Sequence, residues 1–571
     1  MIKHIYLFIF IISFKSNSQN LLWTLDFQDT TIRWRETIAT DNNSNLYMSF
    51  TFGGTMDADP SSNIANHISN GMLDTCLVKF SPSGQYLWSV SFGGNNNEYP
   101  YKIVVDNEGN IIILGYSISN NIINDSNGNS INLNMSNGLR FILKYDSSGN
   151  LIWSRNFGNN SVYSWSIDFD TQNNLYLVGS FEGSAACDFD ITLNNDFLTP
   201  IGNKDCYIMK INSDGYNVWT KQIGTINTEF FQTIKVNRNE NTFCIIGGID
   251  GSVDFDTSSN DYILSPVNGG NLVIAKYDLN SNFLWAKSFE NLNMNSSLNG
   301  NKINFDSNNN IYFSGYFNNS VDFNPDLGQA IFNSTPISTV VYEDSFICKL
   351  DNNGNYISTK TLSSIYQDKV IDFDFDSNNN IFLIGEFKGT LNFDQFYSNY
   401  SLTSLGEYDA YFMKLDNNLN FKWAYKIGNN QDDDKISNIK IDNSNNILIS
   451  GGFKGIMDID LNNNVFNINN NSLTNYDSYV IKYNDLDLLG FENFQIDIIN
   501  IFPNPCNDYL NILNKTNIDK IEIIDMIGKK VIDISNCNNL LKIDIKNLND
   551  GFYNVIIHSN NRIYKNKILK I

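Results

Sequence analysis

Short apolar runs separated by tight polar turns dominate the chain between residues 21 and 483. The clearest unit spans 101–158, where YKIVVD, IIILGYS, RFILKYD and LIWSRNFG are separated by the turns NEGN and SSGN and by one longer connection. Runs of this length, bounded by Asp, Asn and Gly, predict strands joined by hairpins rather than helices. Asp or Asn begins each turn, and Gly or Asn supplies the positive φ that a tight hairpin needs.

This four-strand unit recurs along the chain. Copies of its second strand span 46–54, 111–117, 175–183, 243–251, 311–319, 381–389 and 447–455. Copies of its third strand span 76–80, 141–145, 207–211, 272–277, 346–350, 411–415 and 479–483. Four-stranded units repeated in this way predict a β-propeller with one blade per unit. An open solenoid is the alternative.

The fourth strand decides between the two arrangements. It carries a tryptophan in five units, and the fifth unit has NYISTK at 355–360 instead; the tryptophans are Trp88, Trp153, Trp219, Trp285 and Trp423. The seventh unit has no fourth strand of its own, whereas an unattached copy, LLWTLDF with Trp23, lies at 21–27. We therefore expect an all-β, seven-bladed β-propeller over 19–492, closed by this N-terminal strand.

The repeats over 21–492 resemble the SBBP-type repeats of bacterial β-propellers. The motif D-x-x-G-x-x-x-W, as in Asp146, Gly149 and Trp153, also resembles the Trp-docking repeat of quinoprotein-like propellers. That second resemblance implies that each tryptophan packs between neighbouring blades.

The N-terminal segment has the pattern of a signal peptide. Lys3 and His4 precede an apolar run at 5–14, and small residues at 16 and 18 precede a cleavage site near Gln19. We expect residues 1–18 to be removed. This apolar run is too short to span a membrane, and no later segment reaches the required length.

The C-terminal segment departs from the repeat. After a linker-like stretch at 484–500, strand patterns at 501–512, 521–532 and 543–561 alternate apolar and polar residues, as in a small β-sandwich over 493–571. Ordered motifs here resemble the type A C-terminal sorting domain of the type IX secretion system. The matching residues are Pro503, Asn504, Pro505, Gly528, Leu548, Gly551, Tyr553, Lys567 and Lys570. The resemblance implies passage through the periplasm to the outer-membrane surface or the exterior of a Bacteroidota-type cell, with the type IX machinery as partner. A generic β-sandwich is the alternative.

Composition and rare residues narrow the chemistry. The net charge of −23 argues against nucleic acid as a partner, because phosphates need a basic surface. The three histidines, His4, His67 and His558, fall in separate segments, so they form neither a metal trio nor a Ser/His/Asp set. The seven cysteines are odd in number and scattered, which predicts small buried strand residues rather than disulfides or a metal site.

An Asp-x-Asp or related motif follows the second strand in six units, so we expect these motifs on one rim of the ring. Paired carboxylates can bind Ca²⁺, and they can also serve as acid and base in glycoside cleavage. The candidate calcium ligands are Asp188, Asp190, Asp254, Asp256, Asp322, Asp458 and Asp460. Repetition in six units favours turn capping over catalysis, since an active site needs one special position. No other cofactor is expected.

Three functions stay open. The first is a non-catalytic binding or adhesion protein whose ligand is a glycan or a protein. The second is a secreted carbohydrate-active enzyme, and the third is a structural component of a surface layer. A deep funnel with unmatched charges would favour the enzyme, a flat aromatic or Asn-rich face would favour adhesion, and the absence of a deep pocket would favour the surface layer.

Overall fold

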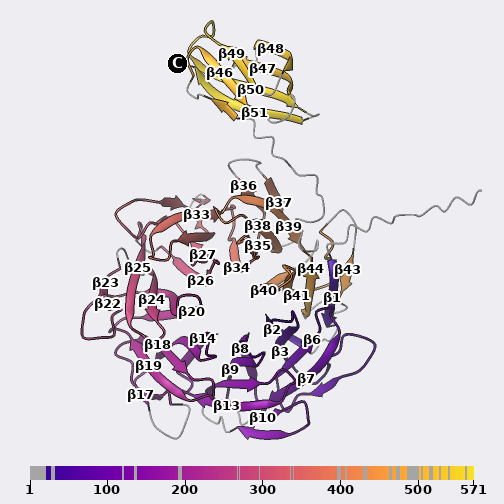
Figure 1. Cartoon of the computed structure of the whole chain (residues 1–571), viewed down its shortest axis with the longest axis vertical. Helices are drawn as coiled ribbons and strands as arrows, with labels where there is room; N and C mark the ends of the chain where they lie inside the picture. The colour runs from indigo at the N-terminus through magenta and orange to yellow at the C-terminus, as the bar shows by residue number, and fades with distance from the viewer. Residues whose placement is uncertain are drawn as a thin grey trace, which may run out of the picture. The chain divides into compact units, whose positions relative to one another are not determined.

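The structure is a computed structural model, shown in Figure 1. It describes residues 21–570, apart from 28–31, 119–120, 134–137, 191–195, 267, 269–270, 295, 335, 338–339, 395–399, 406–407, 429–433, 462–465, 471–475, 485–499, 503–505, 514–517, 526–528, 538–539 and 560–561. The predicted signal peptide at 1–18 lies outside the described residues. The chain forms two compact units, Met1–Leu486 and Asp487–Ile571, and each is described by itself.

Every regular element among the described residues is a β-strand. The first unit contains seven antiparallel sheets with four principal strands each, here called sheets 1 to 7. Sheet 1 contains β2 (Ile32–Thr40), β3 (Leu46–Phe52), β6 (Asp74–Phe80) and β7 (Tyr86–Gly93). Sheet 2 contains β8 (Glu98–Val105), β9 (Ile111–Ser117), β12 (Leu139–Tyr145) and β13 (Leu151–Phe157). Sheet 3 contains β14 (Val162–Phe169), β15 (Leu175–Glu182), β18 (Lys204–Ile211) and β19 (Asn217–Ile223).

The remaining sheets follow the same order. Sheet 4 contains β20 (Glu229–Asn237), β21 (Thr242–Ile249), β24 (Asn271–Asp278) and β25 (Phe283–Asn291). Sheet 5 contains β26 (Leu298–Phe305), β27 (Ile311–Phe317), β32 (Asp344–Leu350) and β33 (Tyr356–Leu362). Sheet 6 contains β34 (Lys369–Phe375), β35 (Ile381–Phe387), β38 (Asp409–Leu415) and β39 (Phe421–Ile427). Sheet 7 contains β40 (Lys435–Ile441), β41 (Ile447–Phe453), β44 (Asp477–Tyr483) and β1 (Leu21–Phe27).

The exchange of the N-terminal strand is confirmed. β1 pairs antiparallel with β44, so Trp23 lies opposite Lys482 and Phe27 lies opposite Ser478. Figure 1 shows the first strand of each sheet nearest the centre of the first unit. These first strands contact one another in sheet order, and β40 of sheet 7 contacts β2 of sheet 1. The cycle of contacts therefore returns to its starting sheet.

Apolar side chains between neighbouring sheets form the core. Every residue of β3, β6 and β32 is buried, as expected for strands covered on both faces. One buried cluster joins Leu448 and Val480 of sheet 7 to Met48 and Phe50 of sheet 1. The junction between the last and first sheets is therefore packed like the others.

The tryptophans of the fourth strands lie between sheets, as their motif predicts. The indole Nε1 of Trp88 donates to the carbonyl of Ser147 at 3.2 Å, in the turn of the next sheet. Gly149 of that turn has φ +86°, and a Cβ there would come 3.0 Å from the Trp88 ring. The same close approach joins Trp23 to Gly84, Trp153 to Gly215 and Trp285 to Gly354. The Gly and Trp of one motif therefore serve two different junctions.

A lysine of the third strand crosses the same junctions. Lys144 Nζ donates to the carbonyl of Ser213 at 3.3 Å and forms an ion pair with Asp106 at 3.0 Å. At the closing junction, Lys482 and Trp23 both donate to the carbonyl of Pro82, at 3.2 Å and 3.0 Å. The other lysines that donate to a turn of the next sheet are Lys79, Lys210, Lys276 and Lys349.

Short two-stranded ribbons fill the connections after the second strands, and Figure 1 shows them at the outer circumference. The ribbons are β4 (Thr55–Asp57) with β5 (Asn66–Ile68), β10 (Asn121–Asn124) with β11 (Ser130–Leu133), β16 (Cys187–Asp188) with β17 (Phe197–Leu198), β22 (Val253–Asp254) with β23 (Ile263–Leu264), β28 (Ser320–Asp322) with β29 (Ile331–Asn333), β30 (Pro336–Ile337) with β31 (Val340–Val341), β36 (Thr390–Asp394) with β37 (Tyr400–Thr403), and β42 (Ile456–Asp458) with β43 (Asn467–Asn469). β10 and β28 pair with β7 and β25, the fourth strands of the preceding sheets.

The second unit contains two sheets. β45 (Asn500–Phe502), β46 (Tyr509–Leu513) and β49 (Leu540–Asp544) form the first. β48 (Lys530–Cys537), β47 (Ile518–Asp525), β50 (Gly551–Ser559) and β51 (Arg562–Lys570) form the second. The sheets share one buried core, in which Leu510 and Ile512 of the first meet Ile521 and Val555 of the second.

Candidate functional site

The first strands of the seven sheets surround a cavity of about 1130 Å³. In sheets 2 to 7, each first strand carries a β-bulge at the same place, so one extra residue faces the cavity. Bulges often re-aim a side chain next to a functional site. The extra residues are Tyr101, Trp165, Gln232, Asn301, Ile371 and Ser437.

A glycine of the second strand accommodates each bulge. A Cβ on Gly179 would come 1.8 Å from the carbonyl oxygen of Tyr163, and one on Gly315 would come 1.8 Å from that of Asn299. The first-strand backbone therefore approaches too closely for any other residue. The equivalent glycines of the other bulged sheets are Gly115, Gly247, Gly385 and Gly451.

The positions that follow the bulge differ from sheet to sheet. The residue directly after it is Lys102, Ser166, Thr233, Lys302, Asp372 or Asn438. Two residues further on lies Val104, Asp168, Lys235, Asn304, Asp374 or Lys440. Backbone geometry is thus repeated around the cavity while the side-chain chemistry is not.

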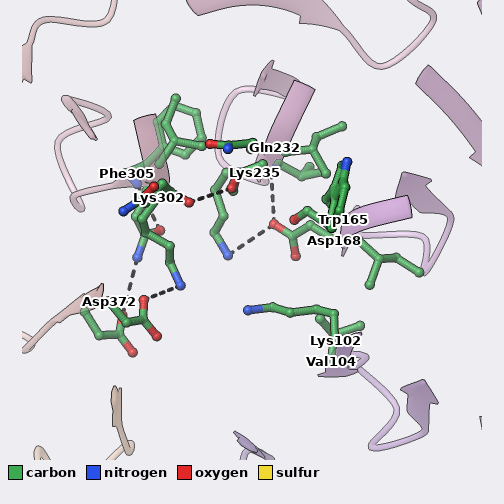
Figure 2. Close-up of a pocket in the computed structure, with 18 of the residues that line it drawn as sticks. Lys102, Val104, Trp165, Asp168, Gln232, Lys235, Lys302, Phe305 and Asp372 are labelled. Carbon is green, nitrogen blue, oxygen red and sulfur yellow. Dashed lines mark hydrogen bonds and ion pairs between the residues drawn. The ribbon is translucent and has the colours of Figure 1, made fainter. Parts of the chain in front are cut away.

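Two carboxylates of the cavity are held ionised by neighbouring cations (Figure 2). Asp168 forms ion pairs with Lys235 at 3.1 Å and Arg238 at 2.8 Å, and it accepts the backbone N–H of Val236 at 2.9 Å. Burial opposes ionisation of Asp168, but these cations outweigh it and lower its pKa to about 2. Asp372 forms an ion pair with Lys302 at 2.5 Å. Burial again opposes ionisation, and the cavity lysines lower the Asp372 pKa to about 2.

Lys102 differs from these pairs. The structure gives it no hydrogen bond and no ion pair with any described residue, and Figure 2 shows its amine pointing into the open centre of the cavity. The charge of Lys302 and the burial of the amine hold the Lys102 pKa well below its usual value, and Lys440 adds to the effect. Lysine amines from several sheets therefore line this cavity, although the whole chain is strongly acidic.

Aromatic side chains line one side of the cavity. The Trp165 side chain is 44% exposed, although it belongs to an inner strand. Its ring stacks on Tyr163 with centroids 5.9 Å apart and planes 8° apart, and it lies 6.3 Å from the Tyr101 ring. Arg140 lies 5.5 Å from the centroid of the Tyr163 ring and 4.1 Å from that of the Tyr116 ring. The result is a supported, solvent-facing aromatic surface beside the lysines.

The Asp-x-Asp motifs lie in the outer ribbons (Figure 1), and none of their described residues lines the cavity. Their place on one rim stays a prediction. Asp254 Oδ1 accepts the backbone N–H groups of Asp256 at 3.0 Å and Tyr262 at 2.8 Å, and the intervening Phe255 is fully buried. Asp188, Asp322 and Asp458 accept equivalent pairs of N–H groups. The first carboxylate of each motif caps its ribbon, and the ribbon runs along the circumference because it packs beside a fourth strand.

No group of three or more His, Cys, Asp or Glu side chains suited to a metal occurs within the part of the chain that the structure describes. The second acidic pattern, at 376–380, is a hairpin turn in which Asp376 Oδ1 accepts the N–H groups of Asn378 and Asn380. Calcium binding by the Asp-x-Asp motifs stays a prediction.

The other rare side chains have structural surroundings. Six cysteines are buried and unpaired; the Cys537 side chain lies outside the described residues. Burial raises the pKa of Cys244 and Cys348 to about 12. His67 bonds to the hydroxyls of Ser89 at 2.7 Å and Ser91 at 3.1 Å.

The sorting-motif residues that the structure describes lie in the second unit. Leu548 packs against its core, Gly551 begins β50, and Tyr553 Oη donates to the carbonyl of Asn549 at 2.9 Å. Lys570 forms an ion pair with Asp550 at 3.3 Å. Lys567 lies on β51, with its side chain outside the described residues, and Pro503, Asn504, Pro505 and Gly528 lie wholly outside them.

Comparison with known families identifies this second unit. Residues 500–571 match the family described as "Secretion system C-terminal sorting domain". The chain therefore carries a sorting domain of the type IX secretion system, which indicates export to the cell surface or the extracellular space. Among the described residues, none of the elements is a helix that could cross a membrane.

Three further proteins are distantly similar to the chain. An uncharacterized WD repeat-containing protein of Acanthamoeba polyphaga mimivirus is 22% identical over 556 residues, which covers 82% of this chain and 39% of that protein. The chain thus spans well under half the length of this relative. The crystal structure of polysaccharide lyase Uly1 is 9% identical, with 78% of this chain and 89% of that chain covered and a TM-score of 0.38. PorZ, a surface component of the type IX secretion system of Porphyromonas gingivalis, is 11% identical, with 96% and 100% covered and a TM-score of 0.15.

Proposed function

We propose that the chain is an exported, non-catalytic binding protein: a closed seven-bladed β-propeller of the SBBP-repeat type whose ligand enters the central cavity. The sorting domain accounts for its destination, with the type IX machinery as partner. The propeller accounts for its activity at the cell surface or outside the cell.

The main support for this proposal is that equivalent positions of the first strands carry chemically different side chains where they line the cavity. Repeats that serve only to close a ring keep the same residue at equivalent positions, as the Trp, Gly and Lys of the junctions largely do. At the cavity, equivalent positions carry Lys102, Ser166 and Asp372, among others. A large cavity with a few convergent polar groups is the usual form of a ligand site. The difference among these side chains also argues against a purely structural surface-layer component.

A carbohydrate-active enzyme is the second candidate, and Lys102 is the observation that favours it. Its amine lies in the cavity without a carboxylate partner among the described residues, and its lowered pKa suits proton transfer. Two of the cavity carboxylates are unsuited to the role of general acid in glycoside hydrolysis. Asp168 and Asp372 have pKa values of about 2, so neither holds a proton to donate near neutral pH.

Binding of the purified full chain to a glycan array and to a panel of surface proteins tests the proposal. We expect a defined set of ligands to bind, and we expect Trp165→Ala to abolish their binding without lowering the melting temperature. Repeating the assay with a chelator tests the calcium prediction, since a loss of binding or of thermal stability would support calcium. Conversion of a bound glycan into shorter products would replace the binding proposal with the enzyme.

A further inference from the structure

We infer that the central cavity binds an acidic oligosaccharide, with the anionic group of one sugar among Lys102, Lys302 and Lys440 and a neighbouring sugar ring against Trp165. This inference rests on the proposed binding function and specifies its ligand class. It follows from three features of the cavity wall.

The first feature is an excess of cations at the centre of the cavity. Lys235 and Arg238 share Asp168, and Lys302 is paired with Asp372. Lys102 and Lys440 also line the cavity, and neither forms a hydrogen bond or ion pair with a described residue. A carboxylate or sulfate between these amines would supply the charge-assisted hydrogen bonds that they lack. It would also relieve the repulsion between Lys102 and Lys302.

The second feature is the aromatic surface formed by Trp165, Tyr163 and Tyr101. Stacking on Tyr163 holds the Trp165 ring in place, and the bulge in β14 directs it into the cavity. A large, partly exposed ring on a rigid strand offers a flat apolar surface, which fits the C–H face of a sugar. Trp165 reaches the cavity from sheet 3, beside Lys102 of sheet 2, and Figure 2 shows both.

The third feature is a set of amide and hydroxyl side chains that sheets 4, 5 and 7 contribute to the cavity wall. Gln232 is drawn in Figure 2, and its Oε1 is buried and accepts no hydrogen bond from the described residues. Amides can donate and accept together, which suits sugar hydroxyls. The other such residues on the cavity wall are Asn299, Asn301, Asn304, Ser437 and Asn438.

These features favour an acidic glycan over a nucleic acid. A nucleotide could also stack on Trp165 and place its phosphate among the lysines. A nucleic acid strand, however, would meet a chain of net charge −23, which repels a polyanion outside the cavity. A short acidic glycan needs only the local cationic centre.

Isothermal titration of the full chain against tri-galacturonate tests the inference, with sulfated and neutral galactose trisaccharides and a nucleoside monophosphate as parallel arms. We expect the two acidic sugars to bind and the neutral sugar to bind at least about tenfold more weakly, because each charge-assisted contact is worth about tenfold or more. The carboxylated and sulfated arms show which anion the site prefers. Binding should weaken with added salt and as pH rises, since only the charged form of Lys102 attracts the anion.

Single-residue variants distinguish the effect of the cavity lysine from the effect of the net charge of the whole chain. Lys102→Gln should weaken acidic-sugar binding about tenfold, and Lys102→Arg should restore most of it. Lys422→Gln is the matched control, because it removes the same charge from an exposed pair with Asp416 on the outer surface. This control should bind as the wild type does, and all three variants should keep the wild-type melting temperature within a few degrees.

Other results would overturn the inference. Equal binding of neutral and acidic sugars, abolished by Trp165→Ala but indifferent to Lys102→Gln, would leave the proposed binding function standing and remove the acidic ligand. Preferential binding of the nucleoside monophosphate would also overturn it. If none of these probes binds, but the array identifies a protein ligand, the inference fails and the proposed function survives. If no ligand on the array binds, both the inference and the proposed binding function are wrong.

Discussion

The junctions between sheets and the cavity inside them are built from the same repeat but follow opposite rules. At the junctions, a Trp of one sheet packs on a Gly of the next, and a Lys donates to a carbonyl beside that Gly, as with Trp88, Gly149 and Lys79. In the cavity, positions fixed by the same bulge carry Lys102 in one sheet and Asp372 in another. This difference indicates that residues repeated from sheet to sheet make the structural contacts. Residues that differ at equivalent backbone positions form the candidate site.

The sharpest way to break this comparison is to remove the junction lysine of sheet 2. Lys144 lies at a junction, is 4% exposed and pairs with the buried Asp106. We expect Lys144→Met to lower the free energy of unfolding of the first unit by about 3–5 kcal/mol, because it leaves a buried carboxylate without its cation. Denaturant unfolding followed by tryptophan fluorescence measures this change.

Ligand binding by the Lys144→Met variant is the measurement that complements its stability. Lys144→Met should bind the cavity ligand with wild-type affinity at temperatures where it is folded. The double variant Lys144→Met/Asp106→Asn should recover part of the lost stability, since it removes the uncompensated charge. A Lys144→Met variant of wild-type stability would show that the repeated lysines are not the structural contacts proposed.

The carboxylates of the two regions should respond oppositely to pH. Burial raises the pKa of Asp368 to about 8, with Asp344 across the junction of sheets 5 and 6 adding to the effect. A carboxyl group whose folded pKa lies above its unfolded value keeps its proton in the folded state, so its stability contribution is present at pH 4 and is lost as pH rises to 8. We expect this loss to amount to roughly 2–3 kcal/mol between pH 5 and 8.

Asp368→Asn should flatten this part of the stability profile, with thermal unfolding measured across the pH range. Asp372 in the cavity provides the contrast, because its pKa is lowered to about 2. Its stabilising contribution is complete at pH 7 and is lost as pH falls from its unfolded pKa of about 4 through that value. Asp372→Asn should therefore destabilise the protein at pH 7, not stabilise it. Two variants with the same pH response would contradict the distinction between the regions.

Substitutions of two turn glycines distinguish the cost of backbone strain from the cost of losing the Trp contact. Gly149 (φ +86°) lies against the Trp88 ring, whereas Gly128 (φ +80°) has nothing near the position of a Cβ. Gly128→Ala should cost about 1 kcal/mol for the left-handed backbone alone. Gly149→Ala should cost roughly 1 kcal/mol more, because the Cβ would also displace the indole. Equal losses in paired thermal melts would show that the Trp contact is not required for stability.

Much of the architecture could be predicted from sequence because it depends on local patterns. The missing fourth strand of the last unit and the orphan strand with Trp23 predicted the pairing of β1 with β44 without any knowledge of distances. Asp and Asn at turn starts predicted the hairpins, although Ser281 and Leu419 take the positive φ where Gly or Asn is expected.

The cavity could not be predicted in the same way. Lys102 and Lys302 come within reach of each other's charge only because the first strands of sheets 2 and 5 line the same cavity, and the apolar pattern does not indicate which first-strand residues face inward. A signal was present in the glycine of six of the seven second strands, such as Gly179, whose Cβ position is occupied by a first-strand carbonyl. It marks the bulge and hence the inward-facing residue. The Asp-x-Asp motifs could likewise be located along the chain by the second strand that each follows, but the outward path of their ribbons could not be predicted.

The smallest predicted effect sharpens the comparison most, because it has the opposite sign from that of Lys144. Lys102 is acted on by the charges of Lys302 of sheet 5, Lys440 of sheet 7 and Lys235 of sheet 4, and by Asp372, which Lys302 already holds in an ion pair. A base whose folded pKa lies below its unfolded value destabilises the fold while charged, and this cost disappears only above its unfolded pKa. Lys102→Gln should therefore raise the free energy of unfolding at pH 7, by about 0.5–1 kcal/mol after screening, and leave it unchanged near pH 11. Thermal melts of Lys102→Gln, with Lys422→Gln as the control that should show no such gain, measure the difference. A clear loss of stability in Lys102→Gln would mean that this amine supports the ring, and the division between structural and ligand-facing lysines would no longer hold.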